Sequence, residues 1–256
     1  MENLTIVKVG GAVLEDEKSF RVFLNRFHSL TGAKILVHGG GRTATLMAGK
    51  LGIENRMVEG RRVTGNEMME VVTMVYGGLI SKKAVAFLQG LDCNALGLCG
   101  ADLNIILATR RSVGQTDYGL VGDVERVNTD ILQLLLRQKT VPVIAPLTHD
   151  GKGQLLNTNA DTIAASLASA LSGLFRVSLL YCLEQNGVLM DFSDQDSVIP
   201  LINRELFDRL REEKIIHSGM LPKLENGFLA LESGVQEVII TNAENPELTK
   251  GTKLIL

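Results

Sequence analysis

The sequence LTIVKVGG, residues 4–11, decides the fold class, and KILVHGGG, residues 34–41, repeats its pattern. Each stretch begins with a short apolar run rich in Val and Ile and ends in consecutive glycines. Such runs are typical of strands buried on both faces of a parallel sheet. Because the carboxyl ends of parallel strands lie at one edge of the sheet, we expect both glycine clusters at that edge.

The rest of the chain alternates similar apolar runs with amphipathic stretches. We expect strands at residues 94–98, 141–145, 177–183 and 235–241, and helices at residues 19–30, 43–51 and 129–138. This alternation predicts an α/β fold with right-handed crossovers and a mostly parallel sheet covered on both faces. Residues 107–126 and 191–200 are polar, and we expect a hairpin or loop excursion at the first and an exposed loop at the second.

Residues 66–88 carry the longest helical pattern. Five apolar residues share one face and three more widen it to about half the circumference, whereas a core helix needs a stripe of only about 100°. The five are Met68, Val71, Val72, Val75 and Leu79, and the three are Met69, Tyr76 and Ile80. Two explanations stay open at this point, burial deep within one subunit or contact with a second subunit.

Composition excludes several classes of protein. The 256 residues include 26 Lys and Arg against 29 Asp and Glu, so a surface for nucleic acid is not expected. The three Cys show no C-x-x-C spacing, which argues against a disulfide framework or a zinc site and favours a reducing compartment. The first residues lack a signal-peptide pattern, and no unbroken run of about 18 apolar residues occurs. We therefore expect one compact cytoplasmic domain with no membrane segment.

The two glycine clusters are candidate anion sites. Backbone N–H groups in such turns, with the start of the next helix, favour phosphate or carboxylate. Either cluster alone is explained by a tight turn, but Gly10-Gly11 and Gly39-Gly40-Gly41 together favour a site. Lys8 precedes the first pair within a strand, where a buried ammonium needs a partner or a ligand. The nucleotide motifs G-x-x-x-x-G-K-[ST] and G-x-G-x-x-G do not follow either strand, and the hydrolase motif G-x-S-x-G is absent.

Two further stretches open helices with polar residues. NTNAD, residues 157–161, supplies more amide and carboxylate groups than a helix cap needs. GMLPK, residues 219–223, places Lys223 at the positive end of the next helix, where a cation is mildly unfavourable unless an anion offsets it. These side chains are candidates to bind a substrate and orient a catalytic lysine.

Five motifs, spread over almost the whole chain, carry a resemblance to a known family. They are VKVGG (7–11), VHGGG (37–41), GRRVT (60–64), NTNAD (157–161) and GMLPK (219–223). In this combination the chain resembles the N-acetylglutamate kinases of the amino-acid kinase family. The resemblance implies a three-layer α/β/α sandwich in a single domain of residues 1–256. Residues 1–175 would bind the substrate and form a homodimer, and residues 176–256 would bind the nucleotide.

The resemblance also implies a reaction and a set of roles. The γ-phosphoryl group of ATP, with Mg²⁺, would pass to the side-chain carboxylate of N-acetyl-L-glutamate in arginine biosynthesis, without a structural metal in the protein. Lys8 and Lys223 would stabilise the transferring phosphoryl group, and Asp161 would hold both lysines. The remaining assignments are Gly10 and Gly11 for phosphate, Gly40, Gly41, Arg62 and Asn157 for substrate, and Glu184, Gly187, Ile216, His217 and Gly219 for nucleotide.

The sequence departs from the family pattern in two places. Relatives carry T-D-V or S-D-V where this chain has Tyr181 to Gly187 without the Asp, so the adenine and ribose contacts stay open. Arg61 stands where relatives often have an apolar residue; it is either an ordinary solvated arginine or one whose guanidinium pairs with a carboxylate on the acyl group. The alternative substrate is therefore N-succinyl-L-glutamate, and a non-catalytic kinase-like regulator is the second alternative.

Overall fold

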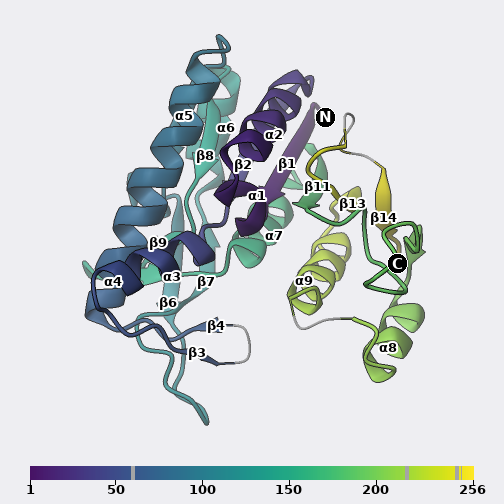
Figure 1. Ribbon diagram of the computed structural model, residues 1–256. Coiled ribbons are helices and arrows are strands. Elements are labelled where there is room, and N and C mark those ends of the chain that lie inside the picture. Colours follow the sequence, from purple (N-terminus) through teal and green to yellow (C-terminus); the bar gives the residue numbers. More distant parts are fainter. Residues whose placement is uncertain (59–60, 217–218, 246–247, 249) are drawn as a thin grey trace.

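An eight-stranded sheet runs through the centre of the molecule in the order β12-β14-β13-β11-β1-β2-β8-β5 (Figure 1). The computed structural model describes residues 1–58, 61–216, 219–245, 248 and 250–256. The strands are β1 (Asn3–Val9), β2 (Ala33–His38), β5 (Ala95–Leu98), β8 (Val141–Ile144), β11 (Arg176–Leu183), β12 (Leu201–Ile202), β13 (Glu237–Asn242) and β14 (Gly251–Leu254). All neighbours are parallel except β13 and β14, so the mostly parallel α/β sheet is confirmed.

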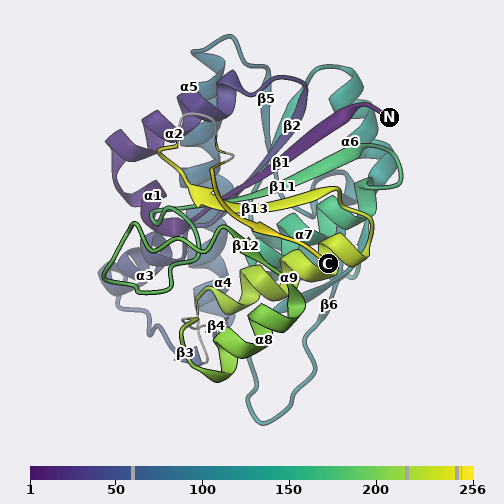
Figure 2. The same ribbon diagram turned by 90° about the vertical axis from the view of Figure 1, so that its right-hand side faces the viewer.

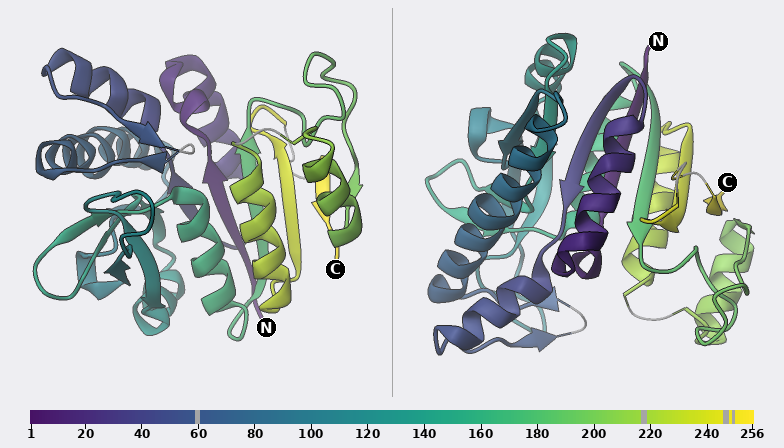
Figure 3. Two further views of the ribbon diagram at one scale, coloured as in Figure 1. Left: turned by 90° about the horizontal axis from the view of Figure 1, so that it is seen from below. Right: turned by 45° about the horizontal axis from the view of Figure 1, so that its top comes forward.

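Helices cover both faces of this sheet (Figures 2 and 3). One face carries α6 (Thr129–Arg137), α7 (Ala160–Leu171) and α9 (Leu221–Glu232), with α8 (Arg204–Glu212) beside α9. The other face carries α1 (Gly11–Glu15), α2 (Glu17–Ser29) and α5 (Ser81–Gln89). Side chains of β1 alternate between the two layers, since Leu4 and Ile6 join the first core and Val7 and Val9 the second.

A smaller sheet lies beside the carboxyl end of the large one. Its order is β10-β9-β6-β7, formed by β6 (Ile106–Arg110), β7 (Gly122–Val127), β9 (Leu147–His149) and β10 (Leu155–Asn157). Strands β6 and β7 are antiparallel, which confirms the hairpin expected between residues 107 and 126. A two-stranded ribbon, β3 (Met57–Val58) and β4 (Arg61–Arg62), and helix α3 (Gly41–Lys50) lie next to it. Residues 191–200 form the expected loop, exposed except around Ile199.

The long helix at residues 66–89 is not a uniform α-helix. It consists of α4 (Asn66–Val72), a π-helical stretch η1 (Thr73–Ile80) and α5, and η2 (Asp102–Asn104) is a short 3₁₀ turn further on. Leu79 does not share the face of the other four expected residues, because its side chain is 40% exposed and theirs are at most 3% exposed. A π-helix bonds residue i to i+5 and therefore rotates the following side chains away from an α-helical register.

The same helix, Asn66–Gln89, is long and apolar enough to cross a membrane by length and composition, the one such helix in the described part of the chain. The sequence holds no unbroken apolar run there, so this signal arises from average hydropathy. Many of its side chains pack inside the protein, with Met68, Val72, Val75 and Ile80 all at most 5% exposed. Buried core helices pass the same test, so the signal is weak evidence for a membrane span.

Candidate active site

The two glycine turns meet at the carboxyl edge of the large sheet. Strands β1 and β2 are parallel neighbours, with Val9 paired to His38, so their following turns lie side by side. A Cβ added to Gly11 would lie 3.9 Å from the backbone nitrogens of both Gly40 and Gly41. Helices α1 and α3 begin at Gly11 and Gly41, where first-turn N–H groups lack partners within the helix. The two expected anion sites therefore form one continuous row of backbone N–H groups. We call this row, from Gly10-Gly11 to Gly39-Gly40-Gly41, the glycine rim.

Gly40 is the turn residue that only glycine fits. Its φ is +150°, and a Cβ there would lie 2.5 Å from Ile80 Cδ1 and 2.9 Å from the Tyr76 ring. The preceding carbonyl of Gly39 accepts a hydrogen bond at 2.8 Å from the ring of buried His38 when Nδ1 carries the proton. Burial lowers the pKa of His38 to about 4, so its ring is neutral at physiological pH. The neutral ring fixes the peptide that leads into the rim.

Asp161 joins two lysines that come from distant parts of the chain. Lys8 Nζ lies 2.8 Å from Asp161 Oδ1, and Lys223 Nζ lies 3.1 Å from Asp161 Oδ2. Lys8 comes from β1, Asp161 from the first turn of α7, and Lys223 from the first turn of α9. Asn159 caps α7 by accepting hydrogen bonds from the N–H groups of Asp161 and Thr162. All three charged side chains are largely buried, at 7% to 11% exposure.

The charges of this triad shift one another's titration. Burial alone raises the pKa of Asp161, but the two lysines outweigh it and hold that pKa below its usual value. Burial, followed by repulsion from Lys8, lowers the pKa of Lys223, which Asp161 partly opposes. Lys223 Nζ also donates to Gly219 O at 2.9 Å. The carboxylate therefore stays ionised and keeps two cations together, which by themselves would repel.

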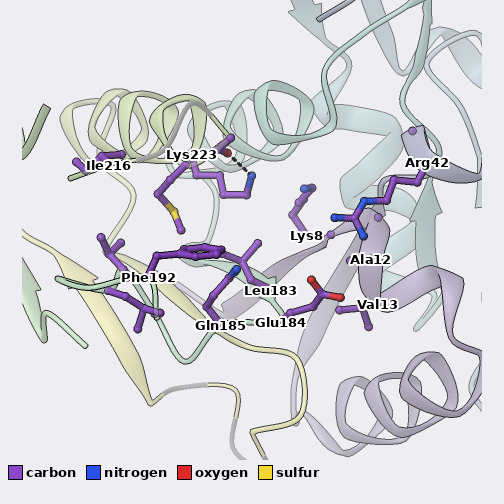
Figure 4. A pocket seen from close by; sticks show the side chains of 18 of the residues that line it. Lys8, Ala12, Val13, Arg42, Leu183, Glu184, Gln185, Phe192, Ile216 and Lys223 are labelled. Carbon is purple, nitrogen blue, oxygen red and sulfur yellow. Dashed lines mark hydrogen bonds between the residues drawn. The ribbon is translucent and has the colours of Figure 1, made fainter. Parts of the chain in front are cut away.

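A cavity of about 420 Å³ opens from the triad toward the C-terminal part of the chain (Figure 4). Lys8 and Lys223 project into it from opposite walls. It reaches every described residue that the sequence suggested for phosphate or nucleotide, and His217 lies outside the described residues. Those lining residues are Gly10, Gly11, Glu184, Gly187, Ile216 and Gly219.

The far end of this cavity is apolar, and sequence reasoning missed most of it. Phe192, from the loop at residues 191–200, lies near Leu183 and Gln185 in Figure 4, with Ile216 beyond it. Val188, Leu189 and Met220 complete this wall. A single Phe in a polar loop was the only sequence signal. Arg42 lines the opposite end, near Lys8, and pairs with Glu15 at 3.5 Å.

A second cavity, of about 190 Å³, lies on the other side of the glycine rim. Both cavities include Gly41, so they meet at the rim. Gly40, Arg62 and Asn157, which the sequence suggested for substrate, line the second one. Arg62 is 8% exposed and donates from Nη2 to Gly41 O at 2.7 Å and to Thr45 Oγ1 at 2.8 Å. Asn157 Nδ2 donates to Thr64 Oγ1 at 3.0 Å.

Two further arginines line the second cavity. Arg61 neighbours Arg62 on β4 and is exposed where Arg62 is buried, so the two side chains leave the strand in different directions. Arg111 follows β6, pairs with Asp123 of β7 and lies 5.7 Å from the Tyr118 ring centroid. The Asp123 hydrogen bond raises the pKa of Arg111 despite partial burial. Sequence reasoning missed Arg111, which stood in a stretch expected only to form a hairpin.

In the described part of the chain, no group of three or more His, Cys, Asp or Glu side chains is arranged to hold a metal ion. The polar groups that face the two cavities are mainly ammonium, guanidinium, amide and backbone N–H groups. Such donors bind phosphate and carboxylate oxygens. The geometry is thus that of two adjoining anion sites, with the Lys8–Asp161–Lys223 triad beside the point where they meet.

Known proteins match this chain over nearly its whole length. An acetylglutamate kinase of Parabacteroides distasonis is 53% identical over 99% of this chain and 100% of its own length. One of Phocaeicola vulgatus is 55% identical over 98% of both chains. The solved N-acetylglutamate synthase of Neisseria gonorrhoeae, complexed with coenzyme A and N-acetyl-glutamate, has the same fold, with a TM-score of 0.84, 19% identity, and coverage of 99% of this chain and 59% of that one.

The family model described as the amino acid kinase family matches residues 3–242. This range includes the glycine rim, the three members of the charged triad and both cavities. With relatives above 50% identity over nearly the full length, the resemblance drawn from the motifs is confirmed. The chain belongs to the amino acid kinase family.

Proposed function

We propose that this protein transfers the γ-phosphoryl group of ATP to the side-chain carboxylate of N-acetyl-L-glutamate, a step in arginine biosynthesis. The names of its relatives support this substrate over N-succinyl-L-glutamate and over a non-catalytic role. The observation that carries the proposal is the Lys8–Asp161–Lys223 triad, since an ATP-sized cavity and a smaller one meet beside it.

The larger cavity suits the nucleotide. Its apolar end, at Phe192 and Ile216, fits a base, and its cationic end fits the phosphates. In this proposal residues 176–256 form most of the nucleotide lobe, with Glu184, Gly187 and Gly219 lining it. Mg²⁺ would arrive with the nucleotide and add positive charge on the phosphate oxygens. Lys8, Gly10 and Gly11 would hold the γ-phosphoryl group from the opposite side.

The smaller cavity suits the acylglutamate. Gly40 and Gly41 would receive the side-chain carboxylate at the rim, and Arg62 and Asn157 would bind the α-carboxylate. That side-chain carboxylate is already ionised near pH 7, so no general base is needed. One of its oxygens forms the new bond to phosphorus while the bond from phosphorus to the bridging oxygen of ADP breaks. The products are an acyl phosphate and ADP.

The lysines would stabilise the charge that spreads over the transferring group. Phosphoryl transfer depends mainly on alignment and on positive charge around the equatorial oxygens. Asp161 would act as a positioning residue, because it holds the two ammonium groups at a fixed separation before substrates bind. Two cations from β1 and α9 can then approach the same phosphoryl group.

The protein is proposed to act in the cytoplasm as a homodimer. Met74 and Leu79 expose 54% and 40% of their surface on a helix whose other apolar side chains from Met68 to Ile80 are buried, which supports a subunit contact there. Residues 1–175, which include this helix, would then supply both the interface and the acylglutamate site.

The test is ADP release with N-acetyl-L-glutamate, with hydroxylamine added to trap the acyl phosphate as a hydroxamate. We expect equal amounts of ADP and hydroxamate. ADP without hydroxamate would show an ATPase and refute the proposal. No turnover with any acylglutamate, despite binding, would favour the regulator. A higher kcat/KM for N-succinyl-L-glutamate than for N-acetyl-L-glutamate would change the proposed substrate but not the proposed type of reaction.

A further inference from the structure

The geometry points to Arg111 as a specificity-determining residue that donates a hydrogen bond to the acyl oxygen of the substrate. This inference rests on the proposed function, because it assigns a contact within the acylglutamate cavity. It starts from an atom that has no role in the fold. Arg111 Nη1 is buried, and it has no hydrogen-bond partner among the described residues.

The rest of the guanidinium is already fixed. Arg111 Nε donates to Asp123 Oδ1 and Oδ2 at 3.2 and 3.1 Å, and Nη2 pairs with Oδ1 as well. The backbone N–H of Arg111 donates to Val121 O at 2.8 Å, which ties the residue to the β6–β7 hairpin. Asp123 therefore holds the guanidinium plane from one side, while Nη1 stays unpaired in a residue that lines the smaller cavity. Buried charged donors are rarely left without a partner.

The guanidinium of Arg62 is held in place by hydrogen bonds to other parts of the fold. Its Nη2 donates to Gly41 O and Thr45 Oγ1, and its Nη1 donates to Asn55 Oδ1. These bonds tie the guanidinium to α3 and to the segment before β3. Arg62 and Arg111 therefore stand on different walls of the cavity, one anchored to α3 and the other to β7. A ligand with oxygens on two sides can contact both.

The lining of the smaller cavity at Arg111 combines a hydrogen-bond donor with apolar surface, as an acetyl group requires. An N-acetyl group offers one carbonyl oxygen and one methyl group. This part of the lining offers the unpaired Nη1 together with the apolar side chains of Val121 and Pro146. In the proposed function the side-chain carboxylate lies at the glycine rim and the α-carboxylate at Arg62 and Asn157, so the acyl oxygen is the remaining acceptor of the substrate.

The experiment compares one ligand that carries this oxygen with one that lacks it. N-acetyl-L-glutamate carries it, whereas 2-propylglutarate keeps both carboxylates and a three-carbon substituent but has neither the acyl oxygen nor the amide N–H. Dissociation constants are measured by calorimetry for the wild type, Arg111→Met and Arg111→Lys. A hydrogen bond from a charged group predicts that Arg111→Met weakens N-acetyl-L-glutamate by about 10- to 100-fold. The same variant should change 2-propylglutarate binding by less than about threefold, since the lost donor has no acceptor there.

Two further variants separate binding from folding. Arg111→Lys keeps a positive charge beside Asp123 but cannot pair with it and also donate through a fixed fork, so its binding loss should follow that of Arg111→Met. Arg110→Met is the matched control, because Arg110 is the neighbouring arginine, is 53% exposed and does not line the cavity. It should leave both dissociation constants unchanged. Melting temperatures, and the KM for ATP, should stay at the wild-type value in Arg111→Lys.

Three results would overturn the inference. Equal losses for both ligands would assign Arg111 to a carboxylate or to the fold. Unchanged binding of N-acetyl-L-glutamate in Arg111→Met would show that no hydrogen bond exists. If both variants fail to fold, the dissociation constants of the two ligands for the wild type still test the inference. Equal affinity for the two ligands would mean that the acyl oxygen is not bound. Failure of the proposed function is distinct, because the wild type would then not phosphorylate N-acetyl-L-glutamate at all.

Discussion

Replacing Asp161 with Asn tests the charged triad most directly, since the side chain keeps its shape and loses its charge. Lys8 and Lys223 then remain buried beside each other without an anion between them. At separations of 2.8 and 3.1 Å and an effective dielectric constant of 20, each ion pair is worth about 5 to 6 kcal/mol of attraction. Desolvation offsets part of this, and breaking a buried pair by removing one partner costs about 3–5 kcal/mol.

We therefore expect Asp161→Asn to lower the free energy of unfolding by about 3–5 kcal/mol at pH 7. Urea unfolding followed by far-ultraviolet circular dichroism measures it, since the chain has no Trp for fluorescence. ATP should raise the stability of the variant more than that of the wild type, because its phosphates replace the missing negative charge. Glu17→Gln is the control, as it removes an exposed pair with Arg21 and should cost less than about 1 kcal/mol.

The pH dependence supplies a second readout. The pKa of Asp161 is lower in the folded protein than its ordinary value of 3.8, so its contribution is complete above that value. It is lost as the pH falls through the folded pKa, and the variant should lack this loss. A destabilisation no larger than that of Glu17→Gln, with the same acid profile as the wild type, would refute the reasoning.

Three other predictions follow from the structure. Lys8→Arg should lower kcat by about 100-fold or more, with a smaller change in KM, because a guanidinium cannot replace the compact ammonium in the transition state; steady-state kinetics at wild-type rate would contradict this. His38→Asn should remove a stability loss of about 2 kcal/mol that the wild type shows in urea unfolding between pH 7.5 and pH 5, because the unfolded imidazole titrates near 6.5 and the folded one at about 4. The variant keeps a donor for Gly39 O, so an unchanged slope would show that other groups cause the loss. Met74→Asp with Leu79→Asp should convert the dimer to a monomer in light scattering, and a wild-type monomer would end that proposal.

Much of the fold could be predicted because strands buried on both faces of a parallel sheet appear in the sequence as short, mainly apolar runs. Residues 4–9 and 34–37 lie within β1 and β2, and the glycines that follow them lie where parallel strands must end. The π-helical stretch could not be predicted, because its apolar residues fit an α-helical period equally well. The stretch packs against α3 and against β9 of the smaller sheet, and these contacts between distant segments are not visible in the local sequence. Leu79 lies in this stretch and therefore departs from the face that an α-helical period assigns to it.

Some residues of the candidate site could likewise be predicted from the sequence, and others could not. Lys8, Asp161 and Lys223 occupy positions where a charge is costly without a partner, and this anomaly is visible in the sequence. Arg111 shows no such anomaly, because an arginine in a polar hairpin is ordinary. Its position depends on the hairpin folding back beside the large sheet and on its pairing with Asp123. Phe192 is similar, since only the path of its loop brings it over the larger cavity.

The position of β1 has a consequence for the order of assembly. Strand β1 lies in the middle of the large sheet and is synthesised long before one of its two neighbours, β11, which begins only at Arg176. Until that segment is synthesised, β1 presents a free row of backbone donors and acceptors flanked by side chains that end up wholly buried, such as Ile6 and Val7.

A nascent chain that stops before residue 176 is thus an open-edged sheet, prone to pair with another copy of itself. The two halves of the protein are consequently poor candidates for separate expression, although each contributes its own cavity wall. Translation that pauses within residues 129–175 would lengthen this exposed period and raise the demand for chaperones. The same strand that brings Lys8 to the centre of the site therefore makes folding of the N-terminal half wait for the C-terminal half.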